Sequence, residues 1–383
     1  MNRGSLPTIN VGQRLAGALA SGHPWLYRDA LPPNSLRTGE WVRVVAGESQ
    51  AFGVFDEEGA IGVRLFSRQQ LPDDGWLRER VREAVSLRAP LAATDTDAYR
   101  LLYGEGDGLP GIVVDRYGRH GIVKLYAPGV GQVLERVVRH LARELPWRGI
   151  SLRDETGLRP LYGDLPPPEL TVREHGLQMI SNPYEGQKTG LFLDQRDNRQ
   201  YVRSVAGDRD VLNLFAYNGG FSLAALAGGA RRVTSVDIAP QALEDARRNV
   251  ELNGFAAGQH QTVQADVFDF LEKSGDQYGL VVCDPPSFAR AKRSRRAAER
   301  AYVRLNALAM RRVRPGGLLA TASCTSQVTP EAFREALAQA AQRAGVRAQV
   351  VHEAGHPVDH PVPLHFPEGR YLKFLLLRIT GSY

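Results

Sequence analysis

The sequence predicts an α/β chain whose largest part is an open parallel sheet, preceded by a small β unit and an α+β unit. Two observations predict the sheet. An apolar run from Val211 leads through Asn218-Gly219-Gly220 into an Ala/Leu-rich helix, which is how a parallel sheet presents a glycine turn to a ligand. Acids follow the next two apolar runs, Asp237 at the end of the second strand and Asp266 after the third. These positions lie at the sheet edge where ligands bind.

The acids predict a bound nucleoside. Asp237 ends its strand where a carboxylate can accept hydrogen bonds from a ribose diol, and Asp266 is placed to bond an adenine amino group. A glycine turn alone is equally typical of a tight strand-to-helix connection. The ordered set, completed by Asp284 in GLVVCDPPSFAR, resembles the motifs of class I S-adenosylmethionine-dependent methyltransferases, which have a Rossmann-like fold. An NAD dehydrogenase would leave the Asp-Pro-Pro element unexplained.

Asp284 is compatible with two methyl-transfer chemistries. In enzymes that methylate exocyclic amines, a similar tetrapeptide ends in an aromatic residue and accepts the amine proton, whereas here Ser287 precedes Phe288. Cys324 favours a second chemistry, because it lies at the carboxyl end of the strand in PGGLLATASCTSQV. Cys283, in contrast, precedes Asp284 inside a strand, so alternation turns it away from the site and predicts a small core residue.

A thiol at this edge serves methylation of a pyrimidine carbon. Carbon 5 is a poor nucleophile, so an enzyme first adds a thiolate to carbon 6, which enables carbon 5 to attack the methyl group. Asp284 would hydrogen-bond N3 and the exocyclic amine of cytosine and assist the addition by protonation. A base must then remove the carbon 5 proton before the thiolate leaves.

Longer motifs carry a resemblance over nearly the whole chain. GQKTGLFLDQRDNR (186–199), NLFAYNGGFS, DPPSFARAKR, SCTSQV and HPVDHPVPLHFPEGRYLK together resemble the bacterial large-subunit ribosomal RNA cytosine-C5 methyltransferases that begin with a PUA domain. The resemblance implies that Cys324 is the nucleophile and that Asp284 orients the cytosine. It also implies S-adenosylmethionine as cofactor and 23S rRNA, or a large-subunit assembly intermediate, as partner. Ser287 stands where many RNA cytosine-C5 methyltransferases carry a second cysteine for product release.

The expected site residues form two groups besides Cys324. The cofactor-binding residues are Phe192, Gln195, Arg196, Asn213, Phe215, Tyr217, Gly219, Asp237, Ile238, Asp266 and Asp284. The RNA-contacting residues are Pro285, Phe288, Arg290, Lys292 and Arg293, the last three in the basic run RAKRSRR. Asn213 departs from the resemblance, since many of these enzymes carry an acid there.

Three domains are expected. Residues 1–70 form a PUA-like RNA-binding domain, with strand-like runs at 41–45, 50–55 and 60–66 and a recognisable Gly22-His23-Pro24-Trp25 core. Residues 71–181 form an α+β middle domain, in which a helix opened by Asp73-Asp74 leads to a strand, strand, helix, strand, strand pattern. Residues 182–383 form the methyltransferase domain, closed by a last strand in RYLKFLLLRIT.

Composition sets the remaining expectations. With 383 residues, two cysteines, no leader and no window of about 20 apolar residues, the chain is expected to be cytoplasmic, free of disulfides and not membrane-bound. A net charge of +6 favours a polyanionic partner. His356, Asp359 and His360 are too irregularly spaced to predict a metal site. Dimers occur among similar proteins, although no pattern in this chain requires a homodimer.

Two rival functions remain open. One is N-methylation of guanine or adenine in rRNA through Asp284, with Cys324 merely packed. The other is an RNA-binding ribosome assembly factor whose methyltransferase domain is vestigial, and Asn213 is the feature that favours it.

Overall fold

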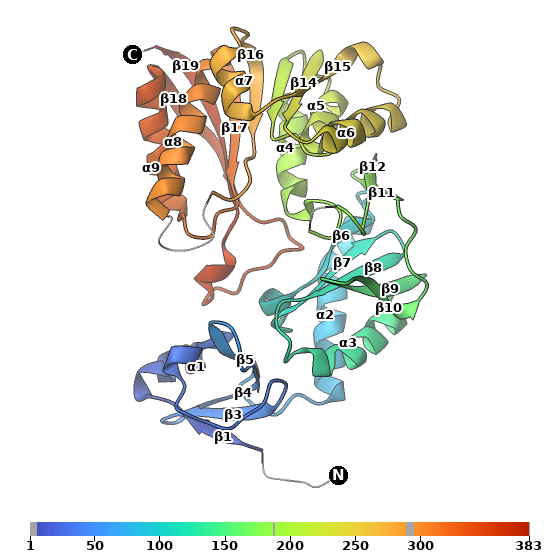
Figure 1. The fold of residues 1–383 in the computed structure, drawn as a ribbon, viewed down its shortest axis with the longest axis vertical. Helices are drawn as coiled ribbons and strands as arrows, with labels where there is room; N and C mark the ends of the chain where they lie inside the picture. Colours follow the sequence, from blue (N-terminus) through green and yellow to red (C-terminus); the bar gives the residue numbers. More distant parts are fainter. Residues whose placement is uncertain (1–5, 187, 289–294, 383) are drawn as a thin grey trace. The chain divides into compact units, whose positions relative to one another are not determined.

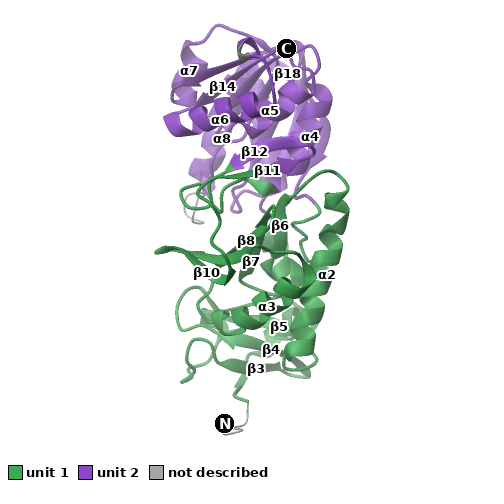
Figure 2. Ribbon diagram, turned by 90° about the vertical axis from the view of Figure 1, so that its right-hand side faces the viewer, with its two compact units in different colours: residues 1–172, 181–193, 358–369 green, residues 173–180, 194–357, 370–383 purple. Residues whose placement is uncertain are grey.

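The computed structural model describes residues 6–186, 188–288 and 295–382, so the predicted RNA contacts Arg290, Lys292 and Arg293 lie outside the described residues. The chain divides into two compact units, coloured separately in Figure 2. The first unit contains residues 1–172, 181–193 and 358–369, and the second contains 173–180, 194–357 and 370–383. The three domains expected from the sequence, with boundaries near residues 70 and 181, stay a prediction.

The N-terminal part of the first unit is a five-stranded sheet in the order β1-β3-β4-β5-β2. Its strands are β1 (Thr8–Asn10), β2 (Trp25–Tyr27), β3 (Trp41–Ala46), β4 (Ser49–Phe55) and β5 (Ile61–Ser67), with the short helix α1 (Ala16–Ser21) packed beside them. Alternate residues of β3 are buried, as expected for a strand with one face on a core. The three strands expected between residues 41 and 66 are therefore confirmed.

The rest of the first unit is a second five-stranded sheet, in the order β10-β9-β8-β7-β6, with two long helices. The elements are α2 (Asp74–Ala92), β6 (Ala98–Tyr103), β7 (Ile112–Tyr117), β8 (His120–Leu125), α3 (Gly131–Glu144), β9 (Gly149–Asp154) and β10 (Gly157–Gly163). Asp73 caps α2 by accepting a hydrogen bond from the backbone nitrogen of Trp76 at 2.7 Å, which confirms the predicted helix start.

The predicted strand pattern of this part was incomplete. Residues 98–117 form two strands, β6 and β7, separated by a short turn in which Gly104 and Gly108 lie in the left-handed region. The edge strand β10 carries Pro160 and mostly exposed residues, so it lacks the alternation that predicts a strand. The last expected strands, β11 (Leu170–Glu174) and β12 (Leu177–Ser181), form a separate two-stranded sheet.

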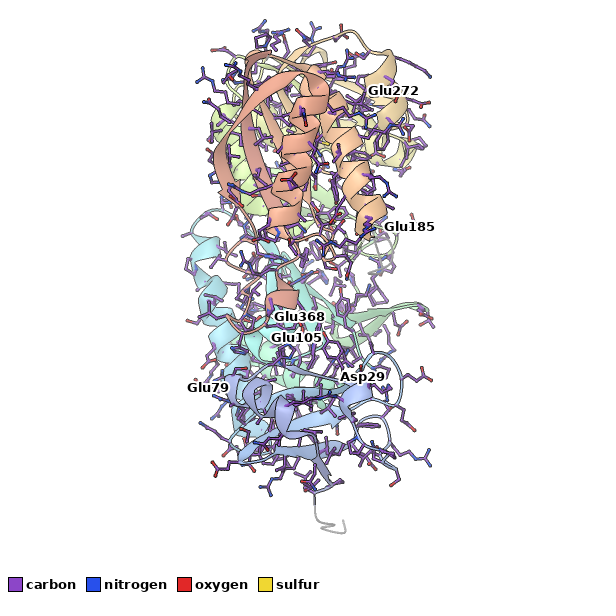
Figure 3. The ribbon with its side chains drawn as sticks, turned by 90° about the vertical axis from the view of Figure 1, so that its left-hand side faces the viewer. Asp29, Glu79, Glu105, Glu185, Glu272 and Glu368 are labelled. Atoms are coloured by element: carbon purple, nitrogen blue, oxygen red, sulfur yellow. The ribbon has the colours of Figure 1, made fainter. Side chains whose placement is uncertain are left out.

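The acids of the loop after β6 have structural roles. Asp107 accepts two hydrogen bonds from the fully buried guanidinium of Arg88, at 2.6 and 2.8 Å. Glu105 accepts the indole N–H of Trp25 at 2.8 Å, and Glu368 lies within 3.4 Å of His23. Figure 3 labels both glutamates. These polar pairs tie residues 358–369 and the first β sheet into one unit.

The second unit is built on a seven-stranded sheet in the order β15-β14-β13-β16-β17-β19-β18. The strands are β13 (Asp210–Leu214), β14 (Arg232–Asp237), β15 (His260–Gln264), β16 (Tyr278–Cys283), β17 (Val313–Ser323), β18 (Val346–Ala354) and β19 (Lys373–Ser382). The first five pair in parallel, and β19 runs antiparallel to both of its neighbours. The predicted reversed last strand is confirmed.

Helices cover both faces of this sheet (Figure 1). One face packs against α4 (Arg196–Val205), α5 (Gly220–Ala227) and α6 (Pro240–Leu252), and the other against α7 (Val267–Lys273), α8 (Arg295–Arg311) and α9 (Pro330–Ala344). In β16, Val282 joins the first core and Cys283 the second, because successive strand residues point to opposite faces. Both faces are thus occupied, and the carboxyl ends of the parallel strands are left for a site. In the described part of the chain, no helix has the length and apolar character needed to cross a membrane.

Candidate cofactor and catalytic site

The loop after β13 has an unusual backbone. Phe215 and Tyr217 have φ angles of 56° and 47°, and Gly219 has 79°, so three positions of one short loop lie in the left-handed region. That conformation costs a non-glycine residue on the order of 1 kcal/mol and persists where surrounding contacts enforce it. Here the nitrogen of Ala216 donates to the oxygen of Val236 at 3.0 Å, and the nitrogen of Gly219 donates to Ala216.

Gly219 also has no room for a side chain. A Cβ built on it would lie 2.8 Å from Cβ of Ala246, on α6, and 3.1 Å from its Cα. The turn therefore passes directly over a helix, and only glycine permits this approach. The loop and α6 together form a close-packed backbone wall beside the end of β14.

Two backbone N–H groups, one in this loop and one just before α6, fix the side chain of Asp237. Its Oδ2 accepts a hydrogen bond from the nitrogen of Tyr217 and its Oδ1 accepts one from the nitrogen of Ala239, both at 2.9 Å. A carboxylate has about four acceptor positions, so each oxygen keeps capacity for a further donor. The next residue, Ile238, is 67% exposed, which is unusual for a large apolar side chain. The pair combines acceptors suited to a diol with an apolar surface suited to a flat ring.

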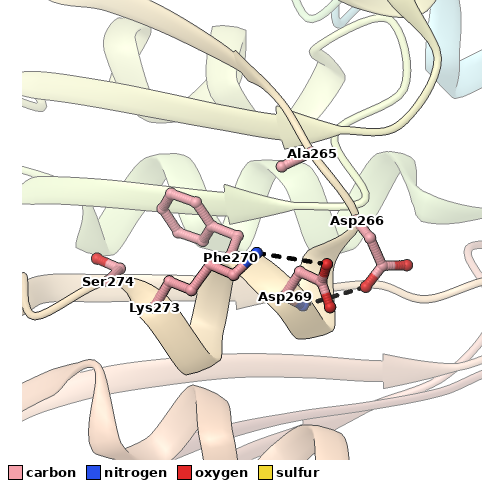
Figure 4. A pocket seen from close by; sticks show the side chains of 6 residues that line it. All are labelled: Ala265, Asp266, Asp269, Phe270, Lys273 and Ser274. Atoms are coloured by element: carbon pink, nitrogen blue, oxygen red, sulfur yellow. Dashed lines mark hydrogen bonds and ion pairs between the residues drawn. The ribbon is translucent and has the colours of Figure 1, made fainter.

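Asp266 caps α7. Its Oδ1 accepts the backbone nitrogens of Phe268 and Asp269 at 2.9 and 3.1 Å, so the acid has a structural role whatever it binds. Among the described residues none donates to Oδ2 of Asp266. A concavity of about 410 Å³ lies beside it and extends along α7 to Ser274. Figure 4 shows the six side chains that line this concavity. That concavity shares only Asp266 with the predicted cofactor residues.

Asn213 lies inside the sheet and not at its edge. It is 1% exposed, and its Nδ2 donates to Oγ of Ser222 at 2.8 Å. The chain of polar contacts continues to Ser235 at 2.7 Å and from there to Nε2 of His260 at 2.8 Å. Burial, and after it the nearby Arg247, lowers the pKa of His260 to about 4. A contact between Asn213 and the cofactor stays a prediction.

The segment before β13 is divided between the two compact units. Gln195 and Arg196 stand at the start of α4 and are buried. The amide oxygen of Gln195 accepts from Nδ2 of Asn198 at 2.6 Å, which fixes its orientation. Phe192 belongs to the first unit, where Nζ of Lys188 lies 4.6 Å from the centre of its ring.

The two predicted catalytic residues follow neighbouring parallel strands. Asp284 comes directly after β16 and Cys324 directly after β17. Both are partly exposed. Cys283, in contrast, is fully buried, and burial, followed by the charge of Asp284, raises the pKa of its thiol. The prediction that Cys283 is a core residue is confirmed, and Cys324 is the cysteine that solvent can reach.

The backbone next to Cys324 is anchored from two other elements. The buried hydroxyl of Thr325 lies 2.7 Å from the hydroxyl of Tyr302, on α8, and 3.2 Å from that of Ser287. Phe288, a predicted RNA contact, places its ring edge-on to Tyr302 at 4.9 Å. Burial is the main cause that raises the pKa of Tyr302, and the charges of Cys324 and Asp284 add to it. Tyr302 therefore stays a neutral hydroxyl close to both groups.

Sequence reasoning assigned no role to Lys373, Tyr302 or Thr325, and Lys373 is the charged one of the three. It is the first residue of β19 and is 3% exposed. Its Nζ donates to the carbonyl oxygens of Thr325 at 2.7 Å and Tyr371 at 2.8 Å. Burial lowers its pKa to about 8, and the charge of Cys324 acts in the opposite direction. A lysine at the start of a continuous apolar strand was the signal available in the sequence.

Residues 159–361 match the family described as S-adenosylmethionine-dependent methyltransferase, and residues 9–68 match the PUA-like domain. A ribosomal RNA large subunit methyltransferase I from Klebsiella pneumoniae (strain 342) is 35% identical over 343 residues, which cover 84% of this chain and 86% of the relative. A ribosomal RNA large subunit methyltransferase from Deinococcus radiodurans is 40% identical over 340 residues, which cover 81% and 83%. The chain belongs to this family of S-adenosylmethionine-dependent methyltransferases.

Solved methyltransferase structures share the fold. An S-adenosylmethionine-dependent methyltransferase from Streptococcus mutans superposes with a TM-score of 0.87 at 23% identity, over 97% of this chain and 100% of that one. A methyltransferase solved in complex with SAH gives the same TM-score and coverage at 24% identity. The predicted fold class, a Rossmann-like methyltransferase domain preceded by a PUA-like domain, is confirmed.

The cofactor of this methyltransferase is S-adenosylmethionine, which supplies an electrophilic methyl group when bound. The described side chains fit it. Asp237 keeps acceptor capacity on both oxygens, Ile238 offers an exposed apolar surface, and the turn at Gly219 permits close approach to the backbone. Among residues 6–186, 188–288 and 295–382, no three His, Cys, Asp or Glu side chains are grouped as a metal site.

Proposed function

We propose that this methyltransferase methylates carbon 5 of a cytosine in 23S ribosomal RNA through a covalent bond between Cys324 and the ring. The observation that carries the proposal is the position of a partly exposed thiol one residue beyond β17, next to β16, which Asp284 directly follows. The names of the K. pneumoniae and D. radiodurans relatives support ribosomal RNA of the large subunit as the substrate.

The proposed chemistry balances as follows. The thiolate of Cys324 adds to carbon 6, forming the S–C6 bond, and the C5=C6 electron pair makes carbon 5 nucleophilic. Carbon 5 takes the methyl group, and the electrons of the broken methyl–sulfur bond stay with the donor sulfur. A base then removes the carbon 5 proton, the C5=C6 bond re-forms and the S–C6 bond breaks, which returns the thiolate.

Asp284 is assigned to the cytosine edge. Its carboxyl group would bond N3 and the exocyclic amine, and a proton shared with N3 would stabilise the charge that develops during thiolate addition. Pro285 is buried and Phe288 packs on Tyr302, so we assign both to shaping the pocket wall that the flipped base meets.

The cofactor assignments rest on the loop after β13 and on the residues that follow β14. We assign Asp237 to the ribose diol, Ile238 and Asp266 to the adenine, and the backbone near Gly219 to close contact with the cofactor. The remaining predicted residues of this group are Phe192, Gln195, Arg196, Asn213, Phe215 and Tyr217.

The test compares Cys324→Ala with Cys283→Ala, which removes the other thiol of the chain. Each variant is incubated with S-adenosylmethionine and unmethylated 23S RNA, and the product is digested and analysed by mass. We expect 5-methylcytidine from the wild type and Cys283→Ala, and none from Cys324→Ala. Unimpaired methylation by Cys324→Ala, or an N-methylated product, would overturn the covalent proposal.

A second experiment looks for the adduct itself. RNA that contains 5-fluorocytidine has no proton to lose from carbon 5, so a covalent complex should accumulate with the wild type. A complex that survives denaturing electrophoresis with the wild type and not with Cys324→Ala is the expected result.

A further inference from the structure

Lys373 is a buried cation for which no described residue supplies a carboxylate partner. Its position in β19 is in register with Ser323, the last residue of β17, so its side chain reaches the corner where Cys324 begins. Both hydrogen-bond acceptors of its Nζ are backbone carbonyls, those of Thr325 and Tyr371. Burying an ammonium group is costly unless an anion compensates for it, and carbonyl oxygens compensate only in part.

Within the described residues, the charge that acts on Lys373 is that of Cys324. The thiolate, which is the form that Cys324 must adopt to attack, is an anion that would compensate for the buried ammonium group. The Thr325 carbonyl also accepts a hydrogen bond from the nitrogen of Val328 at 3.1 Å. The ammonium group thus holds a backbone turn that starts at Thr325, the residue after the nucleophile, and closes at Val328.

We propose that Lys373 is the positioning residue of Cys324: it fixes the backbone at Thr325, and its ammonium group stabilises the thiolate. The inference rests on the proposed function, because it supplies the partner that covalent catalysis by Cys324 requires. The thiol proton leaves to solvent, while the ammonium keeps its three protons and its two carbonyl contacts.

Among the described residues, Asp284 and Tyr302 are ionisable groups whose charges act near Cys324. The carboxylate of Asp284, after β16, opposes formation of a second negative charge nearby. Tyr302, from α8, remains neutral and bonds Thr325. Within the described part of the chain, the ammonium group of Lys373 offsets the effect of Asp284, so its removal should raise the pKa of the Cys324 thiol as well as affect stability.

The test measures the reactivity of Cys324 in the full-length protein without RNA or cofactor. The rate of alkylation by iodoacetamide is followed from pH 6 to pH 10, where Cys324→Ser defines the background because Cys283 is buried. Lys373→Met removes both charge and donor, Lys373→Gln keeps a donor without charge, and Lys373→Arg keeps a charge. We expect alkylation at pH 7 to slow on the order of tenfold in the Met and Gln variants, which is about one unit in the thiol pKa.

The three variants distinguish a role of the lysine charge from a purely structural role. Slow alkylation of Cys324 in Lys373→Gln, with an unfolding curve close to that of the wild type, supports the role of the charge. A wild-type alkylation rate in Lys373→Arg supports it further. Wild-type pH profiles in both the Met and Gln variants would overturn the proposal. The methylation test with Cys324→Ala fails or succeeds independently, since alkylation requires no methyl transfer.

Discussion

The phenolic oxygen of Tyr302 lies 2.7 Å from Oγ1 of Thr325, the residue that follows Cys324. Both side chains are buried, one on α8 and the other just beyond β17. The contact joins the helix that follows the Asp-Pro-Pro segment to the strand end that carries the thiol. Two chain segments that supply the proposed cytosine pocket are thereby held to one another.

Tyr302→Phe should weaken this link. We expect the free energy of unfolding to fall by about 1 kcal/mol, since a buried hydroxyl of Thr325 loses a partner. Methyl transfer should slow by about ten- to a hundredfold, because the backbone at Thr325 that positions Cys324 loses this contact. Urea unfolding and methyl incorporation measure the two effects, and Tyr162→Phe, at a 45% exposed tyrosine of the first unit, is the control. Equal unfolding free energies and equal methylation rates in the two variants would show that the contact between Tyr302 and Thr325 is dispensable.

Gly219→Ala and Gly254→Ala form a matched pair. Both glycines have positive φ, 79° and 74°, but a Cβ would collide with Ala246 only at Gly219 and would meet open space at Gly254. We expect Gly254→Ala to cost about 1 kcal/mol of stability for its backbone alone. Gly219→Ala should cost more and weaken S-adenosylmethionine binding, as calorimetric titration would measure. Wild-type affinity in a folded Gly219→Ala protein would argue against close approach of the cofactor to this turn.

Asp237→Asn tests the assignment of the ribose contact. The amide has the shape of the acid but offers one acceptor oxygen in place of two, and its NH₂ group would face a backbone N–H. We expect S-adenosylmethionine affinity to fall by about tenfold or more, equivalent to roughly 1.4 kcal/mol. Asp276→Asn, at an exposed acid before β16, should bind like the wild type. Equal affinity in the two variants would remove Asp237 from the proposed site.

His260 should make the fold sensitive to acid. Its pKa is lowered to about 4, chiefly by burial, so the folded protein resists protonation that the unfolded chain accepts near pH 6.5. The stabilisation is fully present above pH 6.5 and is lost as the pH falls toward 4, by roughly 2 to 3 kcal/mol. Urea unfolding at pH 7.5 and 4.5 measures the loss, which should shrink in His260→Gln. A His260→Gln protein with the same pH dependence as the wild type would contradict this cause.

Local sequence patterns predicted most elements of both units. Apolar periodicity located the strands around the β13 loop, and Asp73 predicted the start of α2, because caps and alternation depend on residues close in the chain. The sequence failed to predict an element where this local pattern is weak. Edge strand β10 buries little of itself, so it leaves no alternation to detect.

Three side-chain contacts of the candidate site join residues that are distant in the sequence, so the sequence did not predict them. Lys373 donates to a carbonyl 48 residues earlier in the chain, and no local pattern marks which strand end it reaches. Asn213, in the sheet, donates to Ser222 on α5, and Tyr302 contacts Thr325, 23 residues later in the chain. Pairing of β17 with β19 creates the first of these contacts and packing of α8 on the sheet creates the last.

The sequence by itself determined the fold class, the order of acids and glycines along the strand ends, and which cysteine is a core residue. These follow from residue type and alternation, which are properties of short segments. Only the tertiary structure decided which side chains surround Cys324 and how an ammonium group comes to be buried beside it. Such neighbours are set by strand order and helix packing, which depend on the free energy of the whole domain and not on any one segment.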